Sequence, residues 1–279
     1  MPVKRKVPFW YNLECILISH RGTRFFLLLF LGLREKLHGF IEKRQLMSQP
    51  LNLRNFDKKV FSQNGEDGII GEIFRRIGTT DRFFVEFGVQ DGIQCCTRNL
   101  LENNSWSGVW IECSKKLASD ACSQFMQFPI KIVNQFLTAE NIVSVFEQAE
   151  VPLEFDLMVI DVDGNDYWMW NALVNQFHPR VVIIEYNATF GPTAQWVMPY
   201  DPNHRYDETA YFGASLSAYA EFAHRHDYCL VGCDAVGVNA FFVRKDAASA
   251  FEGIMNPPSY HYVAPHYGCC FGHPTERFD

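Results

Sequence analysis

Short apolar runs alternate with helical patterns along the chain from about residue 60 onward. In 64–77, Ile and Phe recur at helical spacing, Asn64 is placed to cap the helix, and Gly78 follows its end. Helical patterns also begin at Thr138 and Asn165. Five runs predict strands, each separated from the next by enough chain for a crossover: 83–87, 108–112, 130–134, 156–161 and 181–186. This alternation predicts a parallel sheet covered by helices.

The pattern changes toward the carboxyl end. A helix is predicted over 214–226, and two strands follow at 228–233 and 238–244, separated by a short turn. Their closeness predicts an antiparallel hairpin. We therefore expect an α/β fold with a mostly parallel sheet of seven strands. The loop at 188–212 is long, and loops of such length are usually functional or disordered.

Basic and acidic residues are distributed unevenly along the chain. The first 60 residues hold twelve Lys or Arg against four Asp or Glu, and the remainder holds thirteen against twenty-eight. The acidic remainder disfavours nucleic acid as a partner. We expect three parts: a basic helical extension over 1–59, one domain over 60–248, and a tail over 249–279 that packs on or near the site.

The basic extension raises the question of a membrane. Its longest uncharged run, 25–33, has nine residues, whereas a spanning helix needs about twenty. A helix candidate at 15–40 remains, which either contacts a bilayer surface or packs against the domain. Glu14 and Arg21 interrupt any signal-peptide pattern, so we predict no export. The nine cysteines include two adjacent pairs, unlike a disulfide framework, which indicates a reducing, cytoplasmic location.

The first predicted strand leads into a glycine-containing turn. Glu86 stands near its end, and Gly88 and Gly92 follow four residues apart. Such a turn at the carboxyl edge of an open α/β sheet allows close approach of a ligand. The segment lacks G-x-G-x-x-G, which favours a loop for the methionine half of S-adenosylmethionine over a pyrophosphate cradle. A tight turn that binds nothing is the alternative.

Polar residues also end the next two strands. Glu112 closes the second strand, where a carboxylate can accept hydrogen bonds from both ribose hydroxyls. Asn134 closes the third and is a candidate for the adenine contact, or an ordinary turn residue.

The fourth and fifth strands end in acids and an amide. Asp161 or Asp163, together with Glu185 and Asn187, offers the oxygen ligands that Mg²⁺ takes. A cation there would polarise a substrate hydroxyl. Alternatively, the aspartates cap the following helix, and an arginine neutralises Glu185. In the long loop, His204 is a candidate base or a solvent-exposed histidine, and Trp196, Tyr206, Tyr211 and Phe212 are candidates for stacking on an acceptor or for ordinary packing.

Several segments together resemble the FkbM-like methyltransferases over about residues 60–245. They are Ser62-Gln63-Asn64-Gly65-Glu66-Asp67-Gly68, Phe84-Val85-Glu86-Phe87-Gly88, Thr97-Arg98-Asn99-Leu100, Trp106-Ser107-Gly108-Val109-Trp110-Ile111-Glu112, Asp161-Val162-Asp163-Gly164-Asn165-Asp166-Tyr167 and Glu185-Tyr186-Asn187. The resemblance implies a Rossmann-like class I methyltransferase fold, S-adenosylmethionine as donor, and O-methylation of sugars or of glycosylated and polyketide products.

The resemblance also assigns candidate residues. It implies a donor loop with Glu86, Gly88, Asp91 and Gly92, and Glu112 as the ribose ligand. Gln63 and Glu66 would close over the site, where Asn134 and Asp161 also stand. We expect an O-methyltransferase for a carbohydrate or glycosylated metabolite, with Asp161 and His204 as catalytic residues. The alternative is a non-catalytic Rossmann-like module that binds a nucleotide or a partner.

Overall fold

The computed structural model describes residues 52–251 and 257–266. The chain divides into two units, Met1–Leu51 and Asn52–Asp279, and the described residues all belong to the second. The predicted helix at 15–40 therefore lies outside the described residues. None of the described helices has the length and apolar character needed to cross a bilayer.

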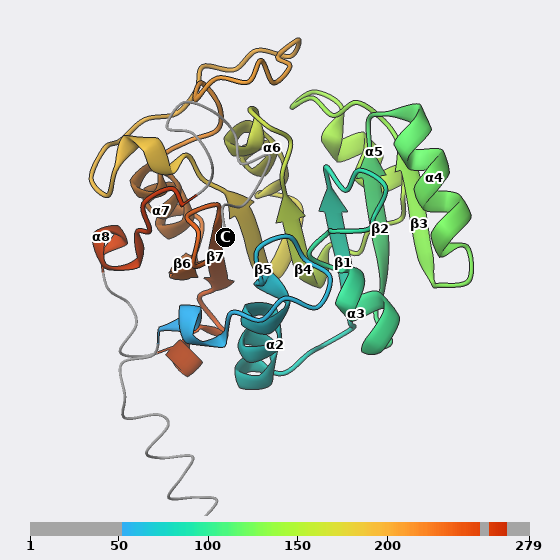
Figure 1. The fold of residues 1–279 in the computed structure, drawn as a ribbon, viewed down its shortest axis with the longest axis horizontal. Helices are drawn as coiled ribbons and strands as arrows, with labels where there is room; N and C mark the ends of the chain where they lie inside the picture. The colour runs from blue at the N-terminus through green and yellow to red at the C-terminus, as the bar shows by residue number, and fades with distance from the viewer. Residues whose placement is uncertain (1–51, 252–256, 267–279) are drawn as a thin grey trace, which may run out of the picture. The chain divides into compact units, whose positions relative to one another are not determined.

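Seven strands form one sheet in the order β3-β2-β1-β4-β5-β7-β6 (Figure 1). Strands β1 to β5 pair in parallel, whereas β7 runs antiparallel to both β5 and β6. This order, with an antiparallel strand beside β5, confirms the predicted Rossmann-like class I methyltransferase fold. The strands are β1 (Phe83–Phe87), β2 (Ser107–Glu112), β3 (Ile130–Asn134), β4 (Glu154–Ile160), β5 (His178–Glu185), β6 (Tyr228–Cys233) and β7 (Asn239–Arg244).

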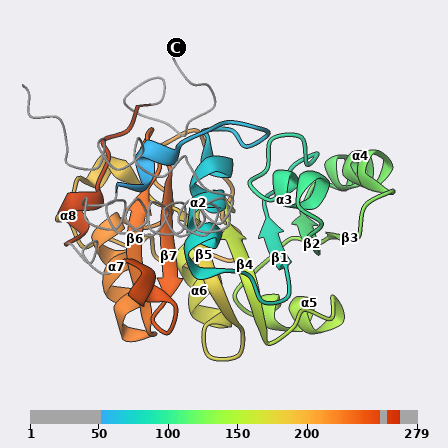
Figure 2. The same ribbon diagram turned by 90° about the horizontal axis from the view of Figure 1, so that it is seen from below.

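Helices cover both faces of the sheet, as Figure 2 shows. One face carries α2 (Glu66–Ile77), α3 (Arg98–Asn103) and α4 (Lys115–Phe125). The other carries α5 (Ile142–Gln148), α6 (Asp166–Leu173) and α7 (Leu216–Arg225). A parallel sheet covered in this way is apolar on both faces. Accordingly, β4 is buried from Phe155 to Ile160.

Aromatic side chains fill the space between sheet and helices. Trp170 on α6 is fully buried, and its ring centroid lies 5.0 Å from that of Phe222 on α7 and 5.2 Å from that of Phe242 on β7. These edge-to-face and tilted contacts add to the stabilisation from buried area. The core therefore fixes α6 and α7 against the sheet, and with them the loops that precede both helices.

Most predicted boundaries agree with the structure to within three residues, but two helix starts differ. The N-cap of α2 is Gly65 (φ +93°) rather than Asn64, and Gly78 ends the helix as predicted. A Cβ on Gly65 would lie 1.5 Å from Asp57 Oδ1, so only glycine fits. The predicted helix at Thr138 begins at Ile142, because the Asn141 side chain accepts a hydrogen bond from Thr138 N and forms a turn first.

Both ends of the described unit extend the expected domain. The short helix η2 (Leu53–Phe56) buries Leu53 against Gly232 of β6, so residues from 52 onward pack with the sheet. After η4 (Ala248–Phe251), the described chain resumes at 257 with α8 (Pro258–His261). Tyr186 donates to Val263 O, which fixes this segment next to the end of β5. The remainder of the predicted tail, 252–256 and 267–279, lies outside the described residues.

Candidate active site

A cavity of about 700 Å³ opens at the carboxyl ends of the parallel strands. Open α/β sheets bind their ligands at this edge. The described lining residues include no Lys or Arg. They include six carboxylates: Glu66, Glu86, Asp91, Glu112, Asp161 and Asp163. The cavity is therefore suited to a ligand that carries positive charge.

Glu86 forms a wall of this cavity near the end of β1. Its carboxylate accepts hydrogen bonds from Cys96 N at 2.8 Å, from Thr97 N at 2.9 Å and from Thr97 Oγ1 at 2.6 Å. Burial raises the pKa of Glu86, although these hydrogen bonds oppose the rise. Glu86 thus holds the segment before α3 in place while lining the cavity.

The glycine turn after β1 lies at the cavity as predicted, but for a different steric reason. Gly88 (φ +83°) has no room for a Cβ, which would lie 1.6 Å from Asp161 O. At Gly92 (φ +79°) a Cβ would lie 2.7 Å from the Trp110 ring. Both glycines are required by packing against the protein. The cavity itself is lined by Gly88, Val89, Gln90 and Asp91, whereas Gly92 faces the core.

Glu112 lines the same cavity at the end of β2, the strand beside β1. Its Oε2 accepts from Gln90 N at 2.8 Å and its Oε1 accepts from Ser114 N at 2.7 Å. A carboxylate has about four acceptor sites, and these two donors with the weak donor Cys113 Sγ, 3.5 Å from Oε1, leave capacity for a ligand. Glu112 is therefore both fixed in orientation and able to accept hydrogen bonds from a diol.

The predicted adenine residue Asn134 is engaged elsewhere. Its amide donates to Glu112 O at 2.9 Å and to Cys113 O at 3.0 Å, and it is not among the described lining residues. The three residues that follow, Gln135, Phe136 and Leu137, line this end of the cavity instead. Sequence reasoning missed them, although their position directly after a strand was a usable signal.

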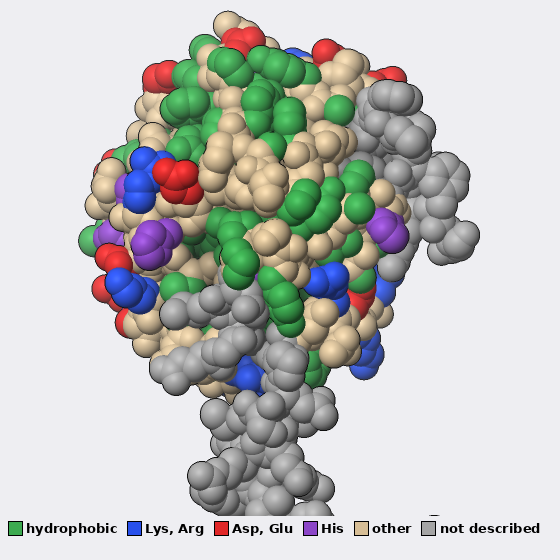
Figure 3. All heavy atoms as spheres, turned by 90° about the vertical axis from the view of Figure 1, so that its left-hand side faces the viewer, with side chains coloured by type: hydrophobic (Ala, Val, Ile, Leu, Met, Phe, Trp, Pro, Cys, Tyr) green, Lys and Arg blue, Asp and Glu red, His purple; other side chains and the backbone are tan. Residues whose placement is uncertain are grey.

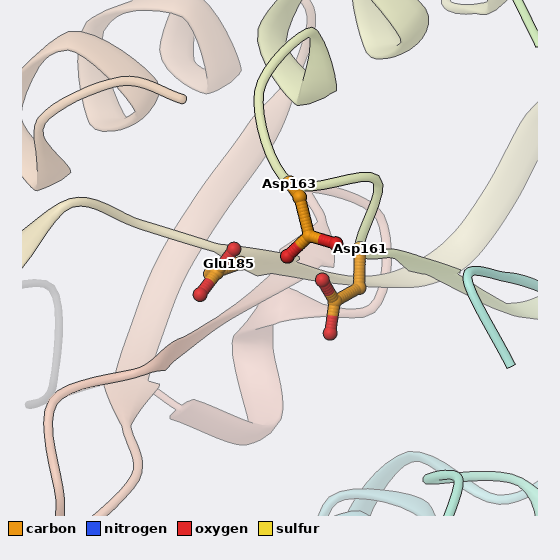
Figure 4. Close-up of side chains that lie close together, drawn as sticks. All are labelled: Asp161, Asp163 and Glu185. Carbon is orange, nitrogen blue, oxygen red and sulfur yellow. The ribbon is translucent and has the colours of Figure 1, made fainter. Parts of the chain in front are cut away.

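Three carboxylates converge at the carboxyl ends of β4 and β5, as Figure 4 shows. Asp161, Asp163 and Glu185 each place one oxygen within 4.8 Å of the others. Glu185 is 2% exposed, and the two aspartates are half-buried. Asp163 (φ +54°) adopts the left-handed region, which turns the chain back after β4. The predicted cluster of acids is therefore present.

Asn187, the predicted amide partner of this cluster, has other contacts. Its Nδ2 donates to Ala210 O at 2.8 Å and to Phe212 O at 3.0 Å, and its Oδ1 accepts from the N–H and hydroxyl of Thr189. With its donors and its acceptor engaged, Asn187 holds the chain after β5. It does not supply a ligand oxygen to the cluster.

Two nearby acids, Asp166 and Asp156, make the helix-start and arginine contacts that were considered for this cluster. Asp166 in the first turn of α6 accepts from Val162 N and Gly164 N, both at 2.9 Å, and so fixes the turn after β4. Arg180, the arginine on β5, pairs with Asp156 at 2.8 Å. Asp166, one of the aspartates considered for a capping role, thus holds this turn.

The connection from β5 to α7 crosses the cavity. His204 and Tyr206 line it, and His204 Nε2 lies 3.1 Å from Asp163 O. A carbonyl only accepts, so Nε2 carries the proton and Nδ1 is the basic nitrogen. On the far side, the Arg205 guanidinium lies 3.6 Å from the centroid of the Phe136 ring. The connection therefore bridges the chain after β4 and the chain after β3.

Aromatic residues of this connection have different positions. Phe212 is buried, whereas Trp196 stacks on Phe190 at 4.2 Å and meets Tyr211, which is 52% exposed. Figure 3 shows hydrophobic side chains gathered at the upper end of one face, the end at which Figure 1 draws this connection. Among the aromatics predicted to stack on an acceptor, Tyr206 is the one that lines the cavity.

Two predicted lining residues precede β1, and a third residue was missed. Gln63 and Glu66 both line the cavity, Gln63 exposed and Glu66 buried. Glu66 accepts from Asn64 N at 2.8 Å and from Asn239 Nδ2 at 2.9 Å. Asn239 opens β7 and also lines the cavity. No sequence pattern signalled Asn239, because its place depends on how β7 pairs.

Among solved structures, the chain is similar at low identity to several methyltransferases. The chain is similar to the O-methyltransferase TomG from Streptomyces achromogenes, involved in tomaymycin synthesis and solved with S-adenosylmethionine, at 16% identity over 68% of this chain and 85% of that chain (TM-score 0.43). It is also similar to an O-methyltransferase from Bacillus cereus solved with S-adenosylhomocysteine, at 16% identity over 84% of this chain and 96% of that chain (TM-score 0.41). A third structure, an S-adenosylmethionine-dependent methyltransferase from Clostridium acetobutylicum, shares 12% identity over 63% of this chain and 89% of that chain (TM-score 0.41).

No family model matches the chain, and no curated protein matches it. Because all three TM-scores are below 0.5, no conclusion about this chain is drawn from these structures. The resemblance to FkbM-like methyltransferases therefore rests on the motifs of the sequence.

Proposed function

We propose that this chain is an FkbM-like methyltransferase that transfers the methyl group of S-adenosylmethionine to a hydroxyl of a carbohydrate or glycosylated metabolite. One observation carries the proposal. Glu112, the turn after β1 and Asp161 come from three neighbouring strand ends and line one cavity. A turn beside a diol acceptor, with a second acid one strand further, is the arrangement that a nucleoside-bearing methyl donor requires.

The donor set fits S-adenosylmethionine in charge and in hydrogen bonding. The sulfonium and the ammonium of this cofactor are cationic, and the six lining carboxylates favour both. Glu112 is oriented by Gln90 N and Ser114 N to accept from the two ribose hydroxyls. When bound, the cofactor supplies an electrophilic methyl group.

The chain's own contribution is alignment of the acceptor and removal of its proton. Transfer forms a bond from the acceptor oxygen to the methyl carbon, breaks the bond from sulfur to that carbon, and releases the hydroxyl proton to a base. Asp161 lies at the cavity to accept and polarise the hydroxyl. His204 is the candidate base through Nδ1, because Nε2–H is held by Asp163 O. Positioning should provide most of the acceleration.

A divalent cation such as Mg²⁺ is a further part of this proposal. The oxygen donors of Asp161, Asp163 and Glu185 suit a hard cation, and two residues of this set, Asp161 and Asp163, also line the cavity. Asn187 is left out of the ligand set because its amide holds the chain after β5. A cation would lower the pKa of a bound hydroxyl.

An uncharged, hydroxyl-rich acceptor is the class that this cavity supports best. The described lining offers no Lys or Arg to an anionic acceptor, whereas carboxylates and amides accept from hydroxyl groups. Tyr206 provides an aromatic ring at the same wall. These features support a carbohydrate acceptor over a phosphorylated one.

Calorimetry with S-adenosylmethionine and with S-adenosylhomocysteine tests the proposal on the full chain. We expect saturable binding of both at one site, and methyl transfer to at least one member of a panel of neutral saccharides. Binding without transfer to any acceptor would favour the alternative of a non-catalytic module. Lack of binding to either compound contradicts the methyltransferase proposal.

We also propose that the protein acts in the cytoplasm, with the basic extension available to contact an anionic membrane surface. The charge of the first 60 residues supports this placement. Flotation with liposomes that contain phosphatidylserine should recover the full chain and not a chain that lacks residues 1–50. Equal recovery of both chains contradicts the membrane contact.

A further inference from the structure

Asn239 has a buried oxygen that the preceding account does not use. The residue is 5% exposed, and its Oδ1 has no hydrogen-bond donor among the described residues. Buried polar atoms of native proteins are almost always bonded, and an exception calls for an explanation such as an ion at that place. Asn239 therefore marks a position where a ligand atom is expected.

The orientation of the Asn239 amide is determined by chemistry. Its neighbour at 2.9 Å is Glu66 Oε1, and an ionised carboxylate only accepts hydrogen bonds. The amide must therefore present its NH₂ group to Glu66 and its oxygen to the other side. Glu66 is itself held, because its second oxygen accepts from Asn64 N at 2.8 Å.

The other side of the amide is next to Glu185. The two residues are register partners in the antiparallel pair of β5 and β7. The backbone groups of Asn239 bond in the opposite direction, to Asp234, with Asn239 N donating to Asp234 Oδ2 and Asp234 N donating to Asn239 O. Glu185 and Asn239 are thus a non-hydrogen-bonded pair, the kind in which opposed side chains come closest.

Glu185 in turn belongs to the cluster with Asp161 and Asp163, whose oxygens lie within 4.8 Å of one another. Oxygen ligands of Mg²⁺ or Ca²⁺ lie about 2.0–2.6 Å from the ion, so ligands on opposite sides are about 4–5 Å apart. The three carboxylate oxygens lie within the span that a single ion can bridge. An amide oxygen beside Glu185 adds a neutral ligand of the type that hard cations accept.

We propose that Asn239 Oδ1 is the fourth protein ligand of a divalent-cation site formed with Asp161, Asp163 and Glu185, and that Glu66 positions it. The role of the cation in catalysis rests on the proposed methyl transfer, but its binding does not. Strand β7 thus contributes to the site a residue that lies more than fifty positions beyond Glu185 in the sequence.

The test is calorimetric titration of the full chain with Mn²⁺, in the absence of any methyl donor, and competition by Mg²⁺. We expect one Mn²⁺ per chain, and a loss of affinity of about tenfold or more in Asn239→Leu, which has similar volume and no ligand atom. Glu66→Gln should weaken binding less, because glutamine can present either an oxygen or an NH₂ group and so leaves the Asn239 amide in two orientations. Asn103→Leu, a change of an exposed asparagine on α3, is the matched control and should bind as the unaltered chain does.

Two further measurements keep the outcomes distinct. Mg²⁺ should raise the thermal unfolding temperature of the unaltered chain and of Asn103→Leu, and not that of Asn239→Leu. If Asn239→Leu fails to fold, Glu66→Gln carries the test, and unchanged Mn²⁺ affinity in that variant overturns the role of Glu66 and of the amide it orients. The proposal is also overturned if the unaltered chain binds no Mn²⁺, or if Asn239→Leu binds it equally well.

Binding of S-adenosylmethionine is measured in parallel, so that the two proposals can fail separately. If the chain binds the methyl donor but not Mn²⁺, the cation site alone is rejected. If it binds Mn²⁺ but not the donor, the proposed function alone is rejected.

Discussion

Strand β4 has an acidic residue near each end, and the two acids have different surroundings. Asp156, near the amino end, is fully buried and accepts from Arg180 at 2.8 Å, from Thr80 N at 2.8 Å and from Arg82 N at 2.9 Å. Asp161, just beyond the carboxyl end, faces two further carboxylates. The first acid is neutralised by its own protein, whereas the second belongs to a concentration of negative charge.

The difference separates residues that stabilise the fold from those that serve a ligand. Burial acts to raise the pKa of Asp156, but Arg180 and the amides of Arg82 and Thr80 outweigh it and hold that pKa below its ordinary value. At Glu86, on the cavity side, burial prevails and the pKa is raised. At the amino ends of the strands, the paired acid Asp156 thus stabilises the fold. At their carboxyl ends, the cavity acids carry negative charge that a cationic ligand would stabilise.

The largest effect is expected at the amino-end edge. Asp156→Asn leaves Arg180, only 13% exposed, without its counter-charge, and breaking a buried pair of this kind costs about 3–5 kcal/mol. Urea denaturation measures the change. Glu154→Gln on the same strand is the control: its carboxylate is 71% exposed to solvent, so the change should be about 1 kcal/mol or less. Equal effects of the two substitutions would contradict the contrast between the edges.

The second largest effect is expected at the carboxyl ends of the strands, on the affinity for S-adenosylmethionine. Glu112→Gln removes the charge that we propose accepts from ribose, and hydrogen bonds to charged groups contribute about 1.5–3 kcal/mol each. The dissociation constant of S-adenosylmethionine should rise by about tenfold to a hundredfold, measured by calorimetry. Glu147→Gln, on the exposed side of α5, should leave it unchanged. An unchanged constant in Glu112→Gln would remove Glu112 from the site.

Acid should destabilise the fold by protonating Asp156, since this removes the charge that pairs with Arg180. The effect should be smaller than that of Asp156→Asn, because a protonated carboxyl keeps both oxygens, whereas asparagine replaces one of them with an NH₂ group. Since its pKa is lower in the folded chain than the ordinary value of 3.8, this contribution is present above about pH 4 and is lost as the pH falls through the folded pKa. Unfolding followed from pH 6 to pH 2 should show a steeper loss of stability in the unaltered chain than in Asp156→Asn. Parallel curves would mean that Asp156 does not contribute.

The smallest effect is expected in the connection that crosses the cavity. Arg205→Ala removes the contact with the Phe136 ring, and such an exposed contact contributes about 0.5–1 kcal/mol. The unfolding free energy should change by no more than this, while S-adenosylhomocysteine dissociates faster in stopped-flow measurements. Arg225→Ala at the end of α7 provides the control. A dissociation rate that does not change would show that the connection does not retain the ligand.

The local elements followed from the sequence because their cause is local. Apolar spacing indicated β1, β3 and β6 with their observed bounds, and Gly78 marked the end of α2. The cavity acids Glu86, Glu112 and Asp161 were also predictable, since parallel strands bring their carboxyl ends to one edge. Asn64 was wrong as a cap because the chain enters α2 through a left-handed residue at position 65 (φ +93°), a conformation that favours glycine.

Choosing between Asn187 and Asn239 required the tertiary structure. The sequence favours Asn187, which directly follows β5, but the fold uses its amide to hold residues 189, 210 and 212. Asn239 is the register partner of Glu185 only because β7, not β6, pairs with β5. The sequence alone thus determined the strands, the helices and the edge at which acids collect, because periodicity acts between near neighbours. The pairing of strands distant in sequence decided which amide stands beside those acids, because that pairing depends on packing throughout the core.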